Sequence, residues 1–155
     1  MRSSGTILVV SVNVSPGRGT AKTPTDGVLV TVEGLEADGH AGTPGRSVSL
    51  LDRGTIERFA AETGIETPGY GAFGENLTVR MEDGPDLSVG DVIEIDGVVL
   101  LVERIGKECH GDDCSIYRRT GRCVMPDHGV FCTVLSGGPV SPGMTGRIRR
   151  SRRGP

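Results

Sequence analysis

The stretch DLSVGDVIEIDGVVLLVERIG, residues Asp86–Gly106, decides the fold class. It contains two runs rich in Val and Ile, VIEI and VVLLVERI, on either side of Asp96-Gly97. An Asp-Gly pair between two such runs favours the type I′ turn of a β-hairpin, because this turn needs a positive φ at both positions. We therefore expect Val92–Ile95 and Val98–Val102 to pair as antiparallel strands.

Strand patterns of the same kind recur along the whole chain. Residues 6–14 and 27–35 each predict one strand, and shorter apolar runs follow at 48–51, near Leu77 and in the last part of the chain, after residue 129. Glycine supplies 25 of the 155 residues, against about 7% in an average protein, which indicates many tight turns. The pattern predicts a mainly β fold of about six or seven short strands, a β-barrel or a sandwich with small helical insertions.

One clear helix is expected over Leu51–Gly64, in the sequence LDRGTIERFAAETG. Asp52 can cap its first turn, and Gly64 lies where a C-cap belongs. Ile56, Phe59 and Ala60 share one face at helical spacing, so we expect that face to be buried.

The charge is unevenly distributed along the chain. The formal net charge is −3, and the terminal run RIRRSRRGP, Arg147–Pro155, holds five Arg and no acid, which leaves −8 for residues 1–146. We expect one domain over 1–146 and a basic, disordered tail over 147–155. A basic tail could also bind nucleic acid or an acidic partner, but no aromatic residues are interleaved with it to stack on bases.

Neither a signal peptide nor an apolar stretch of about 18 residues, the length of a membrane span, is visible in the sequence. We expect a cytoplasmic protein without a membrane association. In that reducing compartment, cysteines are expected to be free thiols or metal ligands rather than disulfides.

All four cysteines fall within IGKECHGDDCSIYRRTGRCVMPDHGVFC, residues 105–132. Three explanations compete, namely a disulfide, a metal site and a reactive thiol. Zinc sites usually use two close pairs of ligands, and only Cys109 and Cys114 are spaced closely, although a site that adds His110 or Cys123 stays open. Cys132 lies in the apolar run VFCTVL, where a cysteine behaves as a small hydrophobic residue.

Cations close to the other thiols favour a reactive thiol, because a nearby positive charge stabilises the thiolate. Lys107 and His110 flank Cys109, and Arg118 follows Cys114. A second candidate site combines Asp38, His40 and Arg46 in a glycine-rich stretch, where the arginine could bind an anion; ordinary turn chemistry explains the same residues. Glu75 and Asn76, in FGENLTV, are candidates for backbone capping before a strand.

Several of these segments together resemble the MOSC family, named after the C-terminal domain of molybdenum-cofactor sulfurases. The resemblance rests on R-x-V-S-L-L at 46–51, GYGAFGENLTV, LSVGDVIEI and IGKECH…CSIY…GRCVMP…GVF, and it runs from about Val9 to Gly143. The last of these is similar to the small, stand-alone bacterial branch of the family. The chain departs from the family pattern at Ser47, where a Gln is expected, and at Met144, where an Asp is expected.

The resemblance implies a barrel similar to the β-barrel domain of pyruvate kinase. It also implies binding of the molybdenum cofactor (molybdopterin) or delivery of sulfur to a metal–sulfur centre, with Cys109 at the position of the family's late cysteine. Pyridoxal phosphate belongs to a separate desulfurase domain in full-length sulfurases, so this chain would need a sulfur donor such as a cysteine desulfurase. A molybdenum-cofactor enzyme or biosynthesis protein would be the other partner.

The expected function is therefore a molybdenum-cofactor-associated sulfur carrier. The catalytic candidates are Cys109, Cys114 and His110, the cofactor-binding candidates are Arg46, His40, Asp38, Lys107 and Arg118, and the candidate ligands of an alternative zinc site are Cys109, Cys114 and Cys123. Two alternatives stay open: a metal-, molybdate- or pterin-binding module without chemistry, and a redox-active dithiol protein that uses Cys109 and Cys114. Whether the chain catalyses sulfur transfer is left open by the sequence.

Overall fold

The computed structural model describes residues 5–15, 22–36, 38, 47–81, 87–106, 120 and 128–151. The elements with defined bounds are, in chain order, β1 (Gly5–Val14), β2 (Thr23–Thr25), β3 (Val28–Thr31), β4 (Gly34–Leu35), β5 (Val48–Asp52), α1 (Arg53–Thr63), β6 (Leu77–Met81), β7 (Val92–Ile95), β8 (Val98–Ile105), β9 (Val130–Ser136), β10 (Gly138–Val140) and β11 (Thr145–Arg149).

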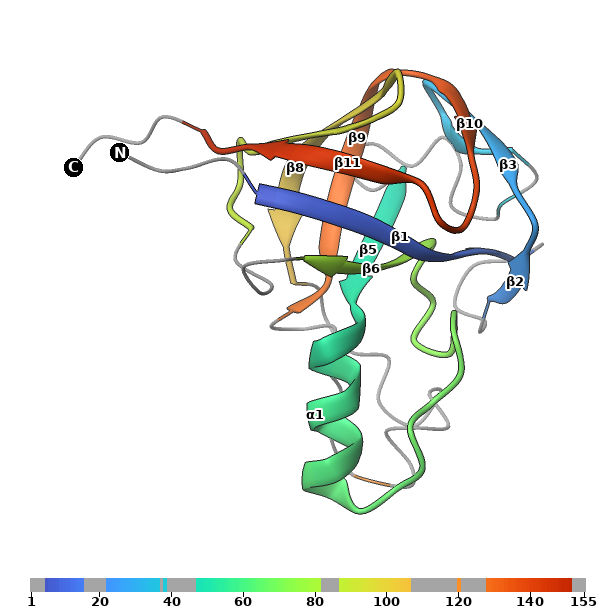
Figure 1. Cartoon of the computed structure of the whole chain (residues 1–155), viewed down its shortest axis with the longest axis vertical. Coiled ribbons are helices and arrows are strands. Elements are labelled where there is room, and N and C mark those ends of the chain that lie inside the picture. The colour runs from blue at the N-terminus through green and yellow to red at the C-terminus, as the bar shows by residue number, and fades with distance from the viewer. Residues whose placement is uncertain are drawn as a thin grey trace.

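Seven of these strands form a closed barrel, in the order β11-β7-β8-β9-β5-β6-β1, and β11 pairs with β1 to complete the ring (Figure 1). β2 extends the sheet beyond β1, and a smaller sheet, β10-β3-β4, lies at one side of the barrel. The mainly β, barrel-like fold expected from the sequence is thus confirmed. Closure of the ring removes the free edges that an open sheet would expose.

The barrel is antiparallel except between β5 and β6, which run in the same direction with Leu50 opposite Leu77. A parallel pair cannot be joined by a tight turn, so the chain must leave the sheet and return. Here α1 makes that crossover and projects from one end of the barrel (Figure 1). The chain then returns to the sheet through residues 64–76.

The helix begins and ends where its sequence predicts. The Asp52 side chain accepts a hydrogen bond from the Thr55 backbone N–H at 2.9 Å, and Gly64 closes the helix in the left-handed conformation, with φ of 76°. Ile56, Phe59 and Ala60 are buried, as expected. Phe59 packs edge-to-face on Phe73, with ring centroids 5.6 Å apart, so the returning segment covers the apolar face of the helix.

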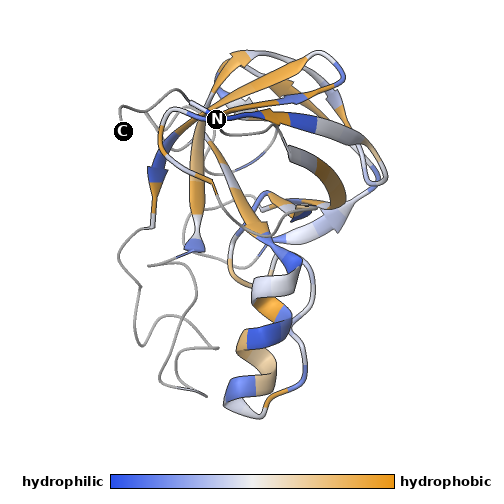
Figure 2. Ribbon diagram, turned by 60° about the vertical axis from the view of Figure 1, so that its left-hand side comes forward, coloured by the Kyte–Doolittle hydropathy of each residue, from blue (hydrophilic) through white to orange (hydrophobic). Residues whose placement is uncertain are grey.

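The barrel core consists of aliphatic side chains that alternate along the strands, with apolar residues prominent on them in Figure 2. The largest fully buried side chains include Ile7, Leu50, Leu77, Ile93 and Leu100. Such a core agrees with the low aromatic content of the chain, because Val, Leu and Ile fill the barrel without large rings.

Two segments differ from the strand pattern expected from the sequence. The run 27–35 forms two short strands, β3 and β4, rather than one. Thr31 Oγ1 accepts a hydrogen bond from the Glu33 backbone N–H at 3.1 Å, and Gly34 has φ of 129°, so the chain reverses at Val32–Glu33. The stretch after β1, expected to be loop, contains β2, which pairs with the end of β1.

The basic run at the C-terminus also begins inside the barrel. β11 includes Arg147, Ile148 and Arg149, and the Ile148 side chain is fully buried. Arg149 pairs with Glu94 of β7 at 3.2 Å. The strand-forming part of the chain therefore extends beyond residue 146, because β11 supplies the closing pair with β1.

Some expectations fall outside the described residues. The helical turns expected around 114–120 belong almost entirely to residues 107–119, and the tail residues 152–155 are likewise outside the described part. In the described ranges, no helix has both the length and the apolar composition that a membrane crossing requires.

The hairpin that decided the fold class has the predicted register. Ile95 lies opposite Val98, and the two turn residues, Asp96 and Gly97, have φ of 43° and 94°. Both values are positive, as a type I′ turn requires. β8 continues to Ile105, three residues farther than expected, and there pairs with β9.

Replacing Gly97 with alanine should cost about 1–2 kcal/mol of unfolding free energy, because a Cβ is unfavourable at positive φ even where space is open. Gly69 is a matched control: a Cβ added at either glycine would have no atom within 4 Å, but only Gly97 has positive φ. Urea unfolding of Gly97→Ala and Gly69→Ala should therefore give different results. Equal stability of the two variants would contradict the turn assignment.

Candidate functional site

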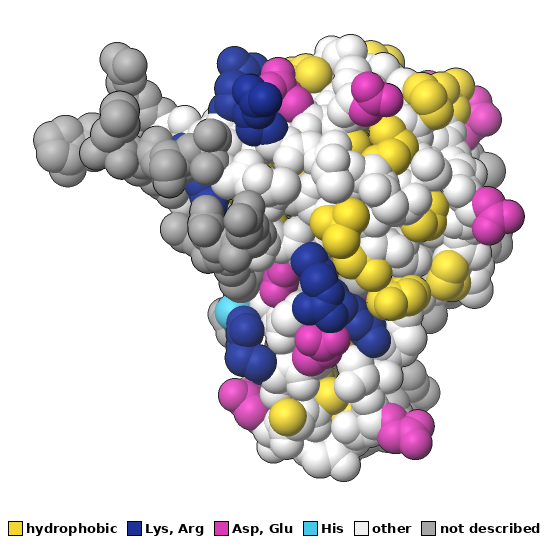
Figure 3. Space-filling model, in the orientation of Figure 1, with side chains coloured by type: hydrophobic (Ala, Val, Ile, Leu, Met, Phe, Trp, Pro, Cys, Tyr) yellow, Lys and Arg dark blue, Asp and Glu magenta, His cyan; other side chains and the backbone are white. Residues whose placement is uncertain are grey.

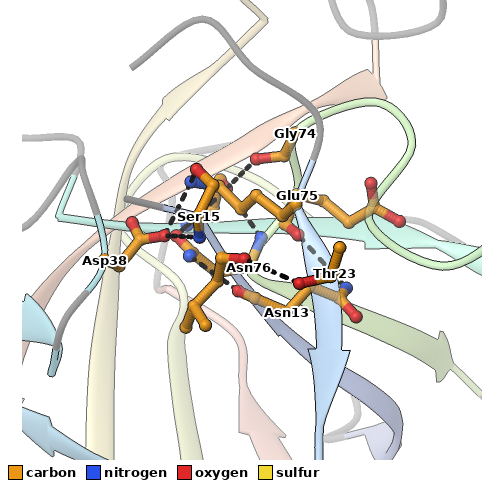
Figure 4. A network of polar contacts seen from close by, with 10 residues as sticks. Asn13, Ser15, Thr23, Asp38, Gly74, Glu75 and Asn76 are labelled. Atoms are coloured by element: carbon orange, nitrogen blue, oxygen red, sulfur yellow. Dashed lines mark hydrogen bonds and ion pairs between the residues drawn. The ribbon is translucent and has the colours of Figure 1, made fainter. Parts of the chain in front are cut away.

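Of the site residues predicted from the sequence, the structure describes Asp38. The others lie outside the described residues: His40, Arg46, Lys107, Cys109, His110, Cys114, Arg118 and Cys123. The described part of the candidate site is a buried polar cluster, in which β1 ends, β5 and β6 begin, and Asp38 lies close by (Figure 4).

Asn76, immediately before β6, connects three parts of the barrel at this end. Its side-chain oxygen accepts a hydrogen bond from the Ser49 backbone N–H at 3.0 Å, and its side-chain nitrogen donates to the Asn13 carbonyl at 3.2 Å. The Asn13 backbone N–H in turn donates to the Asn76 carbonyl at 2.7 Å. The capping role expected for Asn76 is thus what the structure shows, and it extends across two neighbouring strands.

Asn13 is fully buried and its carboxamide is engaged at both ends. The oxygen accepts from the Ser11 hydroxyl at 2.7 Å, while the nitrogen donates to the Glu75 carbonyl at 3.2 Å and to Thr78 Oγ1 at 3.1 Å. A buried amide is stable only when its polar atoms are paired in this way. The cluster is therefore well ordered by its own hydrogen bonds.

Glu75 has a fully buried carboxyl group, which accepts three hydrogen bonds. They come from the Gly71 backbone N–H at 3.1 Å, the Phe73 backbone N–H at 3.2 Å and the Thr78 hydroxyl at 2.8 Å. Burial raises the pKa of Glu75 above its usual value, and these hydrogen bonds, led by that from Thr78, offset only part of the rise. Glu75 thus holds the 71–75 turn against β6.

Asp38 forms an ion pair with Lys22, and both side chains are completely buried. Asp38 Oδ1 lies 2.7 Å from Lys22 Nζ and accepts the Ser15 backbone N–H at 3.1 Å. Lys22 Nζ also lies 3.4 Å from Ser15 Oγ. The Asp38 carboxylate is thus inside the protein and paired with a lysine, and the cofactor contact expected of Asp38 stays a prediction.

Lys22 and the role of Glu75 were not identified from the sequence. Lys22 lies in a stretch rich in Gly, Thr and Pro, where a lysine is normally solvent-exposed, and no local pattern indicates its burial. The sequence FGENLTV does show an acid directly after a glycine-rich turn. It does not show that the Glu75 carboxyl group accepts hydrogen bonds from the backbone of that turn.

Cys132, in β9, belongs to the barrel core and has no exposed surface. Burial raises the pKa of its thiol above the ordinary value, and the charge of Glu103 adds to the rise. The expectation that Cys132 acts as a small hydrophobic residue is confirmed. In the described part of the chain, no three His, Cys, Asp or Glu side chains gather closely enough to bind a metal ion.

The predicted meeting of Arg46 with Cys109 involves residues outside the described ranges, so it stays a prediction. Their neighbours are described and lie toward opposite ends of β5. Ser47 precedes β5, which begins with Val48 opposite Cys132. Gly106 follows β8 and donates its backbone N–H to the Gly129 carbonyl at 2.7 Å, just before β9.

With this geometry established, the chain can be compared with known proteins. Residues 37–145 match the model of the MOSC domain. The chain belongs to the MOSC family. No curated protein matches it. The family assignment agrees with the resemblance noted from the sequence and identifies the barrel as a domain like that of molybdenum-cofactor sulfurases.

Solved structures of MOSC-type proteins share the fold. The YuaD protein of Bacillus subtilis superposes with a TM-score of 0.82 at 17% identity, over 98% of this chain and 100% of that one. YiiM of Geobacillus stearothermophilus gives 0.69 at 21% identity, over 96% of this chain and 76% of that one. YiiM of Escherichia coli gives 0.63 at 20% identity, over 99% and 73% of the two chains.

Asn76→Asp should destabilise the barrel by about 2–3 kcal/mol, because the isosteric change replaces a donor with an oxygen facing the Asn13 carbonyl. Ser49→Ala removes one hydroxyl from the same cluster and should cost less, about 1 kcal/mol. Urea unfolding measures both. A neutral effect of Asn76→Asp would show that the amide does not fix these strands.

The raised pKa of Glu75 predicts how the stability of the protein changes with pH. Above the unfolded pKa, folded Glu75 still holds a proton that the unfolded chain has lost, so stability falls as pH rises through this window and levels off above the folded pKa. As pH rises from about 4.5, the unfolding free energy of wild type should therefore fall relative to that of Glu75→Gln.

Glu57→Gln is the control for that experiment. Glu57 is exposed and pairs with Arg80 at 2.6 Å; the hydrogen bond from Arg80 lowers its pKa. Its small contribution to stability is present above the unfolded pKa and lost as pH falls through the folded one, which is the opposite slope. A Glu75 profile that follows the Glu57 profile would contradict the buried, proton-retaining carboxyl group.

Proposed function

We propose that this protein is a sulfur carrier that binds the molybdenum cofactor and receives or delivers sulfur as a persulfide on Cys109. Membership of the MOSC family supports the association with molybdenum-cofactor sulfuration. The proposal places the protein in the cytoplasm, where thiols stay reduced. A cysteine desulfurase, with pyridoxal phosphate in its own domain, is the proposed donor, and a molybdenum-cofactor enzyme or biosynthesis protein is the acceptor.

The observation that carries the choice of thiol is the burial of Cys132. A carrier thiol must be reached by its donor and must ionise near neutral pH. Cys132 meets neither condition, so sulfur chemistry falls to the three cysteines between β8 and β9. Of these, Cys109 lies closest in sequence to the end of β8, two residues after Lys107 and directly before His110.

The transfer itself is an exchange reaction without net oxidation. The Cys109 thiolate attacks the outer sulfur of the donor's persulfide, a new S–S bond forms on Cys109, and the donor cysteine leaves as a thiolate. Delivery repeats the exchange in the other direction: an acceptor nucleophile takes the outer sulfur and Cys109 leaves as a thiolate. Lys107 would favour the thiolate by its charge, and His110 would accept or return a proton.

The remaining candidate residues would assist either the thiol chemistry or cofactor binding. Cys114 would act as a second thiol, whose thiolate attacks the inner sulfur of the Cys109 persulfide, forms a Cys109–Cys114 disulfide and releases the outer sulfur as sulfide. Arg46, Lys107 and Arg118 would bind the pterin phosphate, as cations that form strong charge-assisted hydrogen bonds, with His40 as a further polar group. When bound, the molybdenum cofactor supplies the metal–sulfur centre that accepts sulfur.

The test is incubation of the purified chain with a cysteine desulfurase and cysteine, followed by intact mass spectrometry. Wild type and Cys132→Ala should both gain the mass of one sulfur atom, whereas Cys109→Ser should gain none while keeping its fold. Cys114→Ser should still accept sulfur, because it leaves the attacking thiol in place.

Two results would overturn the proposal. Sulfur uptake that survives in Cys109→Ser would move the carrier role to another cysteine. Purification with about one equivalent of zinc, whose removal exposes Cys109 to thiol reagents and unfolds the residues around it, would identify a structural metal module instead. Cys109 and Cys123 would then be ligands together with Cys114.

A further inference from the structure

The outer wall of the barrel departs from the usual polarity of a solvated sheet face at β7, β8 and β9. Strands with one solvated face normally place apolar residues inward and polar residues outward. β11 follows this rule, because Ile148 is buried while Arg147 and Arg149 are exposed. In β8, by contrast, the outward residues Val99 and Leu101 are also apolar, and they are only half-buried. The wall is therefore apolar on both of its sides at this strand.

The strand register makes the outward apolar residues neighbours. Val92 of β7, which is also half-buried, lies directly opposite Leu101. In β9, a register shift places Leu135 between the partners of Val99 and Leu100, and the Leu135 side chain is 54% exposed. Cross-strand neighbours on one face have their Cβ atoms about 5 Å apart. Val92, Val99, Leu101 and Leu135 thus form one patch, the outer apolar patch, and contiguous patches of this kind mark interaction surfaces.

The outer apolar patch has opposite charges at its two margins. On the β11 side, Arg149 pairs with Glu94 at 3.2 Å, whereas Arg147 has no ion pair with another described residue. On the β9 side, Glu103 accepts a hydrogen bond from the Thr133 hydroxyl at 3.2 Å, and its charge is likewise unpaired within the described part of the chain. One margin is therefore positive and the other negative.

A surface with this distribution of charge is complementary to itself. When a second copy is turned by 180° about an axis along the strands between β7 and β8, its β11 lies over the β8–β9 side of the first copy. The two apolar patches then meet, and each contact occurs twice, as in the isologous interfaces of homodimers. We propose that the outward face of β7, β8 and β9 is a self-association surface on which a second copy of this chain docks.

The size of this surface predicts the strength of the association. Neighbouring strands lie about 4.8 Å apart, so the four strands from β11 to β9 span only about 15 Å. A stable interface covers about 800 Å² on each partner, which is more than such a face provides. We therefore expect a weak, reversible dimer. The inference does not depend on sulfur transfer or on a bound cofactor, so it can fail or hold independently of the proposed function.

The experiment is sedimentation velocity of the full chain over a concentration series from about 10 µM to about 1 mM. The weight-average mass of wild type should rise from that of a monomer toward that of a dimer. Leu135→Glu should raise the dissociation constant at least about tenfold, because it places a charge inside the apolar contact. Since Leu135 is half exposed in the monomer, urea unfolding should show that this variant still folds.

Leu29→Glu is the matched control. Leu29 is 44% exposed and lies in β3, outside the outer apolar patch, so this change should leave the dissociation constant as in wild type.

An exchange of charges tests the orientation of the two copies. Glu103→Arg and Arg147→Glu should each weaken the association, because each brings like charges together across the interface. The double variant Glu103→Arg/Arg147→Glu should restore it, which a purely structural role of either residue would not produce.

Three outcomes would contradict the inference. A wild-type chain that stays monomeric throughout the series would show that this face does not bind a second copy. A dimer that persists in Leu135→Glu, or that is weakened equally by Leu29→Glu, would place the contact elsewhere on the molecule. A double variant that associates as weakly as the two single variants would rule out the two-fold arrangement with β11 over the β8–β9 side.

Discussion

The Asn76 carboxamide is the interaction on which the barrel most depends. An antiparallel pair joined by a tight turn, such as β7 and β8, obtains its register from that turn, but β5 and β6 are parallel and α1 separates them. Their relative position must therefore be fixed by other contacts. Asn76 provides them by bonding to Ser49 of β5 and Asn13 of β1 at the same time, so one side chain sets the register across three adjacent strands.

The same end of the barrel contains two further buried carboxyl groups, those of Glu75 and Asp38. Glu75 is held by the 71–75 turn and Asp38 by Lys22, and both are surrounded by satisfied amides and hydroxyls. Elsewhere on the face shown in Figure 3, basic and acidic side chains lie next to each other at the surface, which does not favour a continuous nucleic-acid-binding surface. Figure 4 shows instead an ordered cluster of polar side chains at this end of the barrel.

The elements that the sequence predicted correctly are those encoded by local chemistry. Asp96-Gly97 requires positive φ, and Asp52 and Gly64 are caps that need no distant partner. The errors arise where tertiary pairing decides. Arg147–Arg149 are charged at alternate positions, and they form a strand because β1 and β7 lie on either side of them. Lys22 is buried only because Asp38, sixteen residues away, shares its location. Neither effect leaves a local pattern.

In the candidate site, too, the features encoded by local sequence could be predicted and those that depend on tertiary structure could not. Cys132 could be assigned from its apolar neighbours, and the family could be assigned from short motifs, but the arrangement of thiols and cations depends on where long connections leave the barrel. The described neighbours of Arg46 and Cys109 lie toward opposite ends of β5, a strand of five residues that spans about 13–17 Å.

That separation constrains the proposed site. For Arg46 and Lys107 to bind one phosphate, the segments that precede Ser47 and follow Gly106 would together have to cover it. Such a site would be assembled from two long connections at different strand ends, so its shape would depend on tertiary structure, which no single motif of the sequence encodes.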